Sequence, residues 1–206
     1  MNLNLITKYF TPTHILDIGG HTGEFFSLAK YFFPQSSIFI IEGNKECESY
    51  IQKLNTKYLI RVLGSEKKIT TFYKTSQDPI STGNSIYREI TPHFNDEVLV
   101  KEEVQQYTID STFKEANFDL IKIDTQGSEL DILKGGERIA KQAKGILIEV
   151  SVEKYNEGSP LYSEVVEFMD SYGFVEKETV SEFKTTTEYN LKVHQKDILF
   201  VNKKLL

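Results

Sequence analysis

The sequence predicts an α/β fold in which a mostly parallel sheet carries helices on both faces and ends in an antiparallel strand. Apolar runs of strand length recur along the chain, and most are followed by a turn and a helical pattern. These runs are residues 15–18, 37–42, 118–124 and 145–150. Two last runs, 174–176 and 198–201, have no clear helix between them. Such a pair is expected to be antiparallel and to lie at one edge of the sheet.

Carboxylates stand at or near the ends of the four main runs. They are Asp17, Glu42, Asp124 and Glu149. In open parallel sheets, ligands bind in the crevice beyond the carboxyl ends of the strands. We therefore expect these acids to converge on one pocket.

The first strand leads into a glycine-rich turn before a helical pattern at residues 24–33. The turn consists of Gly19, Gly20, His21, Thr22 and Gly23. Glycine allows positive φ and lets a ligand approach the backbone closely, and the free N–H groups of the following helix favour negative charge. The turn is therefore a candidate ligand site, although glycines in such turns also serve the backbone alone.

The order of residues in this turn favours S-adenosylmethionine over NAD. Asp17 precedes the glycines, and His21 stands where a dinucleotide fingerprint has its second glycine. An acid complements the ammonium of an amino-acid ligand, whereas it would sit poorly beside a pyrophosphate. Glu42, at the tip of the second strand, is placed to hold a ribose through its hydroxyls.

Length and composition exclude several classes of protein. The 206 residues, 39% of them hydrophobic, suit a single domain covering residues 1–206. A net charge of −6 argues against a nucleic-acid groove. The single cysteine, Cys47, excludes an internal disulfide and a cysteine cluster for zinc. No apolar run reaches the ~18 residues of a membrane span, and residues 1–9 lack the pattern of a signal peptide. We expect a cytoplasmic protein without a membrane span.

A polar stretch at residues 74–97 interrupts the regular pattern. Further strands are expected at 58–63, 69–73 and 98–109, and further helices at 45–54 and 161–172. A long segment without periodicity is uncommon in a compact domain unless it covers a site. We therefore interpret residues 74–97 as a lid or binding loop, and residues 151–160 as a second loop that contributes to acceptor specificity.

The region after the third acidic strand carries the most specific motif. Its elements are Lys122-Ile123-Asp124, Gly127, Glu129-Leu130 and Leu133-Lys134-Gly135, with Ile148-Glu149-Val150 downstream. This pattern resembles the signature of the FkbM family of S-adenosylmethionine-dependent methyltransferases, over about residues 15–201. The chain differs where the family often has Val-Glu, here Thr125-Gln126, and where it often has Asn, here His21.

The resemblance implies a fold, a reaction and a cofactor. The fold is the class I methyltransferase Rossmann-like three-layer sandwich, mostly parallel with an antiparallel closing strand. The reaction is methylation of a hydroxyl oxygen on a small molecule, a sugar or a glycan precursor, as in polysaccharide biosynthesis. The cofactor is S-adenosyl-L-methionine.

By position, the resemblance also implies roles for individual residues. Asp17 and residues 19–23 would hold the methionine end of the cofactor, and Glu42 its ribose, next to Asn44. Gly64 and Ser65 would lie near the adenine, and Asp124 near the sulfonium.

Methylation of a hydroxyl calls for a base, and two strand-tip acids are the main candidates. These are Asp124 and Glu149, which geometry favours over the loop histidines His93 and His194. A divalent metal between the two acids is conceivable, but no third ligand is evident, so we expect none. Two other functions stay open, a nicotinamide-dependent oxidoreductase and a non-catalytic binding module on the same fold.

Overall fold

The computed structural model describes residues 1–186 and 192–206 and contains a seven-stranded sheet with the order β3-β2-β1-β7-β8-β10-β9. The strands are β1 (His14–Ile18), β2 (Ser37–Glu42), β3 (Lys57–Ile60), β7 (Leu120–Ile123), β8 (Gly145–Ser151), β9 (Phe174–Thr186) and β10 (Lys192–Asn202). Strands β3, β2, β1, β7 and β8 pair in parallel, and β10 is antiparallel to both of its neighbours. The predicted fold class is confirmed.

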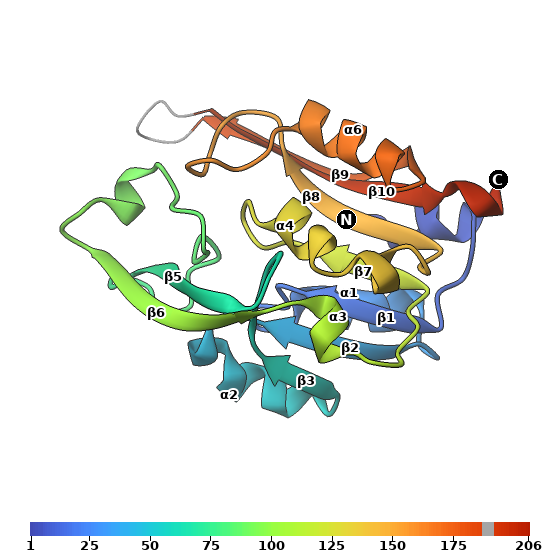
Figure 1. The fold of residues 1–206 in the computed structure, drawn as a ribbon, viewed down its shortest axis with the longest axis horizontal. Helices are drawn as coiled ribbons and strands as arrows, with labels where there is room; N and C mark the ends of the chain where they lie inside the picture. Colours follow the sequence, from blue (N-terminus) through green and yellow to red (C-terminus); the bar gives the residue numbers. More distant parts are fainter. Residues whose placement is uncertain (187–191) are drawn as a thin grey trace.

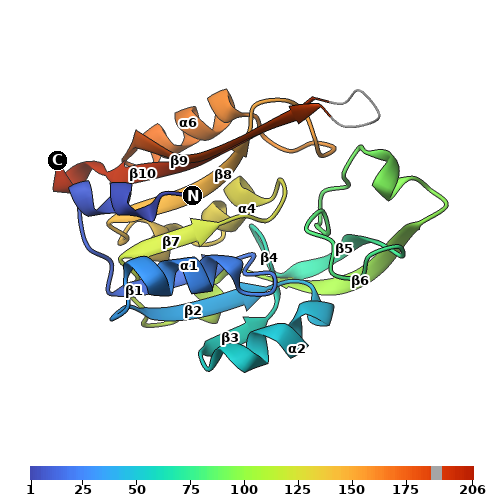
Figure 2. The same ribbon diagram turned by 180° about the vertical axis from the view of Figure 1, so that it is seen from behind.

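Helices cover both faces of this sheet, as the opposite views of Figures 1 and 2 show. The α-helices are α1 (Glu24–Phe32), α2 (Glu48–Ile51), α3 (Ile109–Thr112), α4 (Glu129–Lys134), α5 (Glu137–Ala140) and α6 (Tyr162–Ser171). The 3₁₀ helices are Leu3–Lys8, Lys45–Cys47, Gln52–Leu54, Pro92–Phe94 and Lys203–Leu205. One apolar core lies between the sheet and α4, α5 and α6, and a second lies on the α1 side.

Strand β7 shows how the two cores arise from alternation. Ile121 and Ile123 belong to the core on the α4 side, whereas Leu120 belongs to the core on the α1 side. The intervening Lys122 shares the α1 face with Leu120, and its ammonium lies 5.5 Å from the centre of the Phe25 ring. The positively charged Lys122 side chain therefore lies within the apolar core on the α1 side, just below the carboxyl edge of the sheet.

The predicted strand 58–63 is in fact two strands in different sheets. Strand β3 ends at Ile60, and the Arg61 N–H donates to the Glu42 carbonyl at 2.8 Å. The chain then turns away, and β4 (Val62–Leu63) joins a second sheet of order β4-β6-β5, with β5 (Lys68–Thr75) and β6 (Leu99–Tyr107). The predicted strands at 69–73 and 98–109 are confirmed as β5 and β6.

The closing strands form the antiparallel pair that was predicted, but they are much longer. Between the apolar runs 174–176 and 198–201, the polar sequence continues as strand up to Thr186 and again from Lys192. The extra length carries the hairpin beyond the parallel strands. Because that part is not covered by a helix, its residues need not be apolar.

Three segments gather at the carboxyl edge of the parallel strands (Figures 1 and 2): the connection 76–98 between β5 and β6, the loop 152–161, and the outer end of β9 and β10. The first two are joined by backbone hydrogen bonds. Ile90 donates to the Tyr155 carbonyl at 3.0 Å, and Glu157 donates to the Arg88 carbonyl at 2.8 Å. Both loops expected to shape the acceptor site thus lie against each other.

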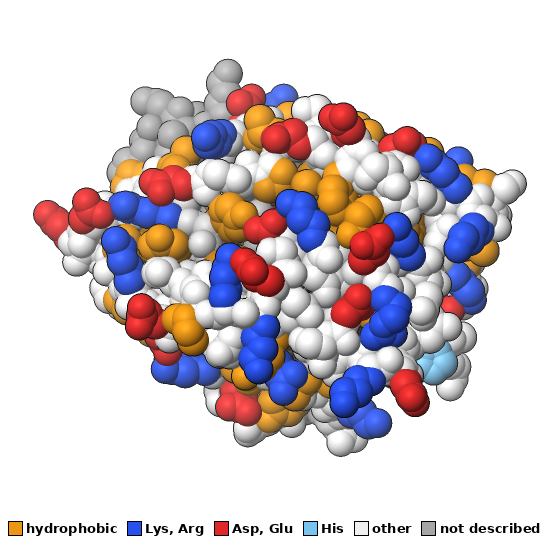
Figure 3. Space-filling view, viewed as in Figure 1, with side chains coloured by type: hydrophobic (Ala, Val, Ile, Leu, Met, Phe, Trp, Pro, Cys, Tyr) orange, Lys and Arg blue, Asp and Glu red, His pale blue; other side chains and the backbone are white. Residues whose placement is uncertain are grey.

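The charged side chains of one face and the length of the helices complete the description of the fold. In the view of Figure 3, Lys and Arg side chains are interspersed with Asp and Glu, and no basic stripe crosses this face. Within the part of the chain that the structure describes, no helix has the length and apolar character to span a membrane.

Candidate active site

A cavity of ≈ 510 Å³ opens at the carboxyl edge of the parallel strands. This volume falls within the ~300–1,000 Å³ usual for small-molecule sites. Six of the predicted site residues line it: Gly19, His21, Glu42, Asn44, Asp124 and Glu149. A second cavity of ≈ 370 Å³ shares Gly19, His21 and Asp124 with the first and adds Gly20. The strand-end residues therefore meet around two neighbouring cavities.

The glycine turn is tight because its glycines pack against neighbouring strands. Gly19 has φ of 76°, and a Cβ there would lie 1.7 Å from the Asp124 carbonyl oxygen. A Cβ on Gly20 would lie 2.4 Å from the Ile40 side chain. His21 adopts φ of 47°, which is uncommon for a residue with a side chain. The glycines thus have a packing role, and the turn also forms part of the cavity wall.

Glu42 ties this turn to the end of β2. Its two carboxylate oxygens accept from the His21 N–H at 2.8 Å and from the Asn44 N–H at 2.7 Å. Burial raises the pKa of Glu42, although these two N–H groups act in the opposite direction. Each oxygen has a second lone pair, so the carboxylate can still accept from a ligand in the cavity.

Asp17 does not reach the cavity wall. Its side chain is fully buried on the α1 side, and neither carboxylate oxygen has a hydrogen-bond partner in the described structure. Burial raises the pKa of Asp17 to about 6, although the positive charge of Lys122, 3.8 Å away, lowers it. Asp17 was expected to hold the methionine end of the cofactor, but it lines neither cavity, because Ile18 follows it in β1 and leaves its side chain below the glycine turn.

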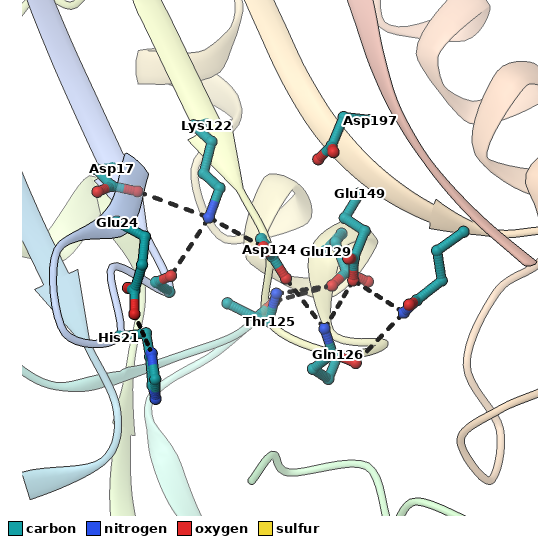
Figure 4. A network of polar contacts seen from close by, with 12 residues as sticks. Asp17, His21, Glu24, Lys122, Asp124, Thr125, Gln126, Glu129, Glu149 and Asp197 are labelled. Carbon is teal, nitrogen blue, oxygen red and sulfur yellow. Dashed lines mark hydrogen bonds and ion pairs between the residues drawn. The ribbon is translucent and has the colours of Figure 1, made fainter. Parts of the chain in front are cut away.

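Lys122 links the buried Asp17 to the cavity (Figure 4). Its ammonium donates to Asp124 Oδ2 at 3.1 Å and to the Gly19 carbonyl at 3.3 Å. Burial alone would lower the pKa of Lys122, but the charges of Asp124 and Asp17 outweigh burial and raise it. Lys122 was predicted only as part of the family motif, without a role of its own, although a lysine within an apolar strand is itself an unusual signal.

Asp124 and Glu149 form a carboxyl pair held by two glutamines (Figure 4). Gln126 Nε2 donates to Asp124 Oδ1 at 3.1 Å and to Glu149 Oε2 at 2.7 Å. Gln195 Nε2, from β10, also donates to Glu149 Oε2, at 3.1 Å. Both glutamines line the cavity, and sequence reasoning assigned neither to the site.

The two carboxyls have opposite pKa shifts. Burial raises the pKa of Glu149 well above its ordinary value, and the negative charges of Asp124 and Asp197 raise it further. Burial also acts to raise the pKa of Asp124, but the ammonium of Lys122 outweighs it, so that the pKa of Asp124 is lowered. The pair therefore retains one proton, on Glu149, at pH values where two isolated carboxyls would both be ionised.

The turn that presents Gln126 is fixed by Glu129 at the start of α4. The Glu129 carboxylate is buried and accepts from the N–H groups of Thr125 at 2.9 Å and Gly127 at 3.0 Å. Within this turn Gln126 has φ of 56° and Gly127 has φ of 111°. A left-handed conformation at a non-glycine residue costs free energy, and here it brings the Gln126 amide to the carboxyl pair.

Several predicted residues lie outside the cavity lining. Thr22, Gly23, Gly64 and Ser65 do not line it. A Cβ on Gly64 would lie 2.3 Å from the Gln106 amide, so packing fills that space. The break after β3 instead brings Val62 and Leu63 to the wall, together with Phe72 of β5.

The two candidate histidines differ in position. His93 lines the cavity, whereas His194 does not, and its Nε2 lies 2.6 Å from Glu182 Oε1. His21 Nε2 lies 2.6 Å from the Ile80 carbonyl oxygen, which ties the glycine turn to the segment 76–98. Among the residues described, no group of three or more His, Cys, Asp or Glu side chains is arranged to hold a metal ion.

Comparison with known proteins agrees with the fold and shows the family. A family model described as the methyltransferase FkbM domain matches residues 17–176, more than half of the chain. The chain belongs to the FkbM family of S-adenosylmethionine-dependent methyltransferases. The recognition made from the sequence and the predicted cofactor are thereby confirmed, and the nicotinamide-dependent alternative is set aside. A search of curated proteins finds no match.

Solved structures share the fold at low sequence identity. TehB from Haemophilus influenzae has a TM-score of 0.53 and 12% identity, over 98% of this chain and 63% of that one. A protein described as an RNA methyltransferase from Pyrococcus horikoshii has a TM-score of 0.52 and 10% identity, over 97% and 77%. The N-terminal domain of EvdMO1, crystallised with SAH, has a TM-score of 0.50 and 12% identity, over 97% and 79%. At such identities the likeness concerns the fold alone.

Proposed function

We propose that this chain transfers a methyl group from S-adenosylmethionine to a hydroxyl oxygen of a small molecule, such as a sugar or a glycan precursor. The observation that carries the proposal is the carboxyl pair of Asp124 and Glu149 in the wall of the cavity, next to the glycine turn. A hydroxyl must lose its proton when it is methylated, and a carboxylate of raised pKa is suited to accept that proton.

The cavity residues suit the parts of the cofactor. Ile41, Val62, Leu63 and Phe72 make one end apolar, as an adenine ring requires. Glu42 would accept from the ribose hydroxyls, with Asn44 beside it. The second cavity, which extends from Gly19 past Gly20, would take the methionine end. Asp17 would contribute indirectly, because its carboxylate lies 3.8 Å from the ammonium of Lys122, which lines this second cavity.

The sulfonium supplies an electrophilic methyl group, so the protein chiefly has to position the acceptor and remove its proton. The Asp124 carboxylate, whose side chain is 29% exposed, presents negative charge to the cavity and favours a cation there. Glu149, in its deprotonated form, would take the proton of the acceptor hydroxyl as the new C–O bond forms. Gln126 and Gln195 hold the Glu149 carboxylate in place.

Residues 74–97 would serve as the lid of this site. Ser85 Oγ donates to the Thr125 carbonyl at 2.7 Å, and Asn44 Nδ2 donates to the Pro79 carbonyl at 2.7 Å. These bonds attach the segment to the turns after β7 and β2. A closed segment excludes water, which strengthens the electrostatic interactions inside.

Binding and turnover test the proposal. Isothermal titration of the protein with S-adenosylmethionine and S-adenosylhomocysteine should show saturable binding at one site per chain. A panel of hydroxylated acceptors is then screened for formation of S-adenosylhomocysteine, with mass spectrometry of the product to locate the methyl group. Absence of binding to both cofactor forms, or methylation at nitrogen or carbon alone, would contradict the proposal.

A further inference from the structure

The hairpin of β9 and β10 adds one row of side chains to the site, and this row was not part of the sequence prediction. Gln195 and Phe183 are direct partners in the antiparallel register, and so are Asp197 and Glu149. Side chains of directly paired residues lie on the same face of a sheet. Gln195 and Asp197 are two residues apart on β10, so their side chains also share a face. Glu149 of β8, Gln195 of β10 and Phe183 of β9 therefore lie on one face of three neighbouring strands.

Phe183 stands at the outer end of this row. It is 57% exposed, and it lines the cavity together with Thr185, two residues further along the same face. A large apolar side chain left this exposed beside a cavity has surface available for a ligand. The Gln195 amide lies between it and the catalytic candidate Glu149, to which it donates at 3.1 Å.

Most of the other lining groups near this end are uncharged. The segment 76–98 contributes Ser81, Thr82, Asn84, Ser85 and Thr91 to the lining, together with Ile86 and His93. Among the described lining residues there is no lysine, and the arginine present, Arg61, lies 4.6 Å from the Tyr107 ring at the apolar end. Asp124, and Glu149 in its deprotonated form, would repel an anionic group placed close to the reacting oxygen.

We propose that Phe183 determines acceptor specificity by stacking on the ring of an uncharged sugar, with the reacting hydroxyl directed toward Glu149. A pyranose has an apolar C–H face and a polar rim. Phe183 would cover the face, while Gln195 and the hydroxyl and amide groups of the segment 76–98 would bind the rim. This inference rests on the proposed function and narrows its substrate class to glycosides without a carboxylate or phosphate on the reacting ring.

Saturation-transfer NMR tests the inference on the whole protein with S-adenosylhomocysteine bound. The probes are the methyl glycosides of glucose, mannose, galactose and fucose, compared with methyl glucuronide and glucose 6-phosphate. We expect at least one neutral glycoside to bind, and both anionic probes to bind at least about 10-fold more weakly than it does.

Substitutions then test the residue. Phe183→Ala should weaken binding of the neutral glycoside about 5- to 10-fold, and Phe183→Tyr should restore it, because the flat ring is what is needed. Ile69→Ala is the matched control, since Ile69 is 60% exposed on β5 and does not line the cavity. The affinity for S-adenosylhomocysteine should stay the same in all three variants.

The outcomes separate the acceptor assignment from the proposed function. Equal effects of Phe183→Ala and Ile69→Ala, tighter binding of an anionic probe, or no binding of any neutral glycoside would overturn the inference. If wild-type protein failed to bind S-adenosylhomocysteine, the proposed function itself would fail. Cofactor binding without dependence on Phe183 would overturn only the acceptor assignment.

Discussion

Glu42 and Glu149 occupy similar places at the carboxyl edge, yet they are held in different ways. The Glu42 oxygens accept from two backbone N–H groups, whereas Glu149 is held by two glutamine side chains next to another carboxyl. Backbone donors cannot be withdrawn, and they favour the charged form. A neighbouring carboxylate disfavours it. This difference supports the proposed roles, in which Glu42 is a binding group and Glu149 is the group that exchanges a proton.

The largest expected effect is on turnover in Glu149→Gln. Glutamine keeps the size of the side chain and cannot accept the proton, so kcat should fall about 100-fold or more. The affinity for S-adenosylhomocysteine, measured by titration calorimetry, should change less than about 3-fold. Turnover is measured with the acceptor found in the screen. A variant that retained more than a tenth of wild-type turnover would remove Glu149 from the role of base.

The pH dependence of turnover gives an independent test of the same role. Because burial and the charge of Asp124 raise the pKa of Glu149, the base is protonated and inactive at low pH. The kcat of the wild type should therefore rise with pH through a pKa above that of an ordinary glutamate, and this limb should be missing from the residual activity of Glu149→Gln. A flat profile over the same range for the wild type would contradict a carboxyl base.

Lys122 should matter for stability more than any surface lysine. Lys122→Met removes the cation that lies between Asp17 and Asp124, and leaving buried charge unpaired costs about 3–5 kcal/mol. Lys8→Met is a suitable control, because Lys8 is 54% exposed and its ion pair with Glu178 is worth little. Urea unfolding monitored by circular dichroism measures both variants. If both variants lost the same free energy of unfolding, Lys122 would contribute no more to stability than a surface lysine.

Asp17 should make the free energy of unfolding depend on pH. Its pKa is raised to about 6 from 3.8, so the folded state binds the proton more tightly than the unfolded state does. The stabilisation that comes from protonated Asp17 is fully present below about pH 4 and is lost as the pH rises through 6. Asp17→Asn should match wild type below about pH 4 and exceed it by up to about 3 kcal/mol at pH 8. Urea unfolding at several pH values checks this, and parallel curves for the two proteins would contradict it.

Sequence reasoning succeeded where the signal was local. The apolar strands and the acids at their ends specified the sheet, and Glu42, Asp124 and Glu149 do meet at one cavity. Asp17 lies outside the cavity lining because one more strand residue, Ile18, follows it and leaves its side chain within the sheet, below the edge. The pattern showed an acid near a strand end, but how far its side chain lies from the edge depends on where the strand stops.

Residues that depend on long-range pairing could not be predicted. Gln195 and Phe183 lie in a polar stretch that gives no clear strand pattern, and their positions follow from the register with β8 and with each other. The family resemblance placed the adenine near Gly64 and Ser65 by position. The break at Arg61 carries Val62 into another sheet, and that sheet change supplies the apolar wall instead.

The smallest expected effect separates the two glutamates most clearly. Glu42→Gln keeps an oxygen for one backbone N–H but replaces the other oxygen with a donor, which faces either His21 or Asn44. Binding of S-adenosylhomocysteine should weaken about 10-fold, because one hydrogen bond to a charged acceptor is lost. With saturating cofactor, kcat should change less than about 3-fold. Tight cofactor binding combined with a large loss of kcat would reverse the assignment, and would make Glu42 the residue that participates in the chemical step.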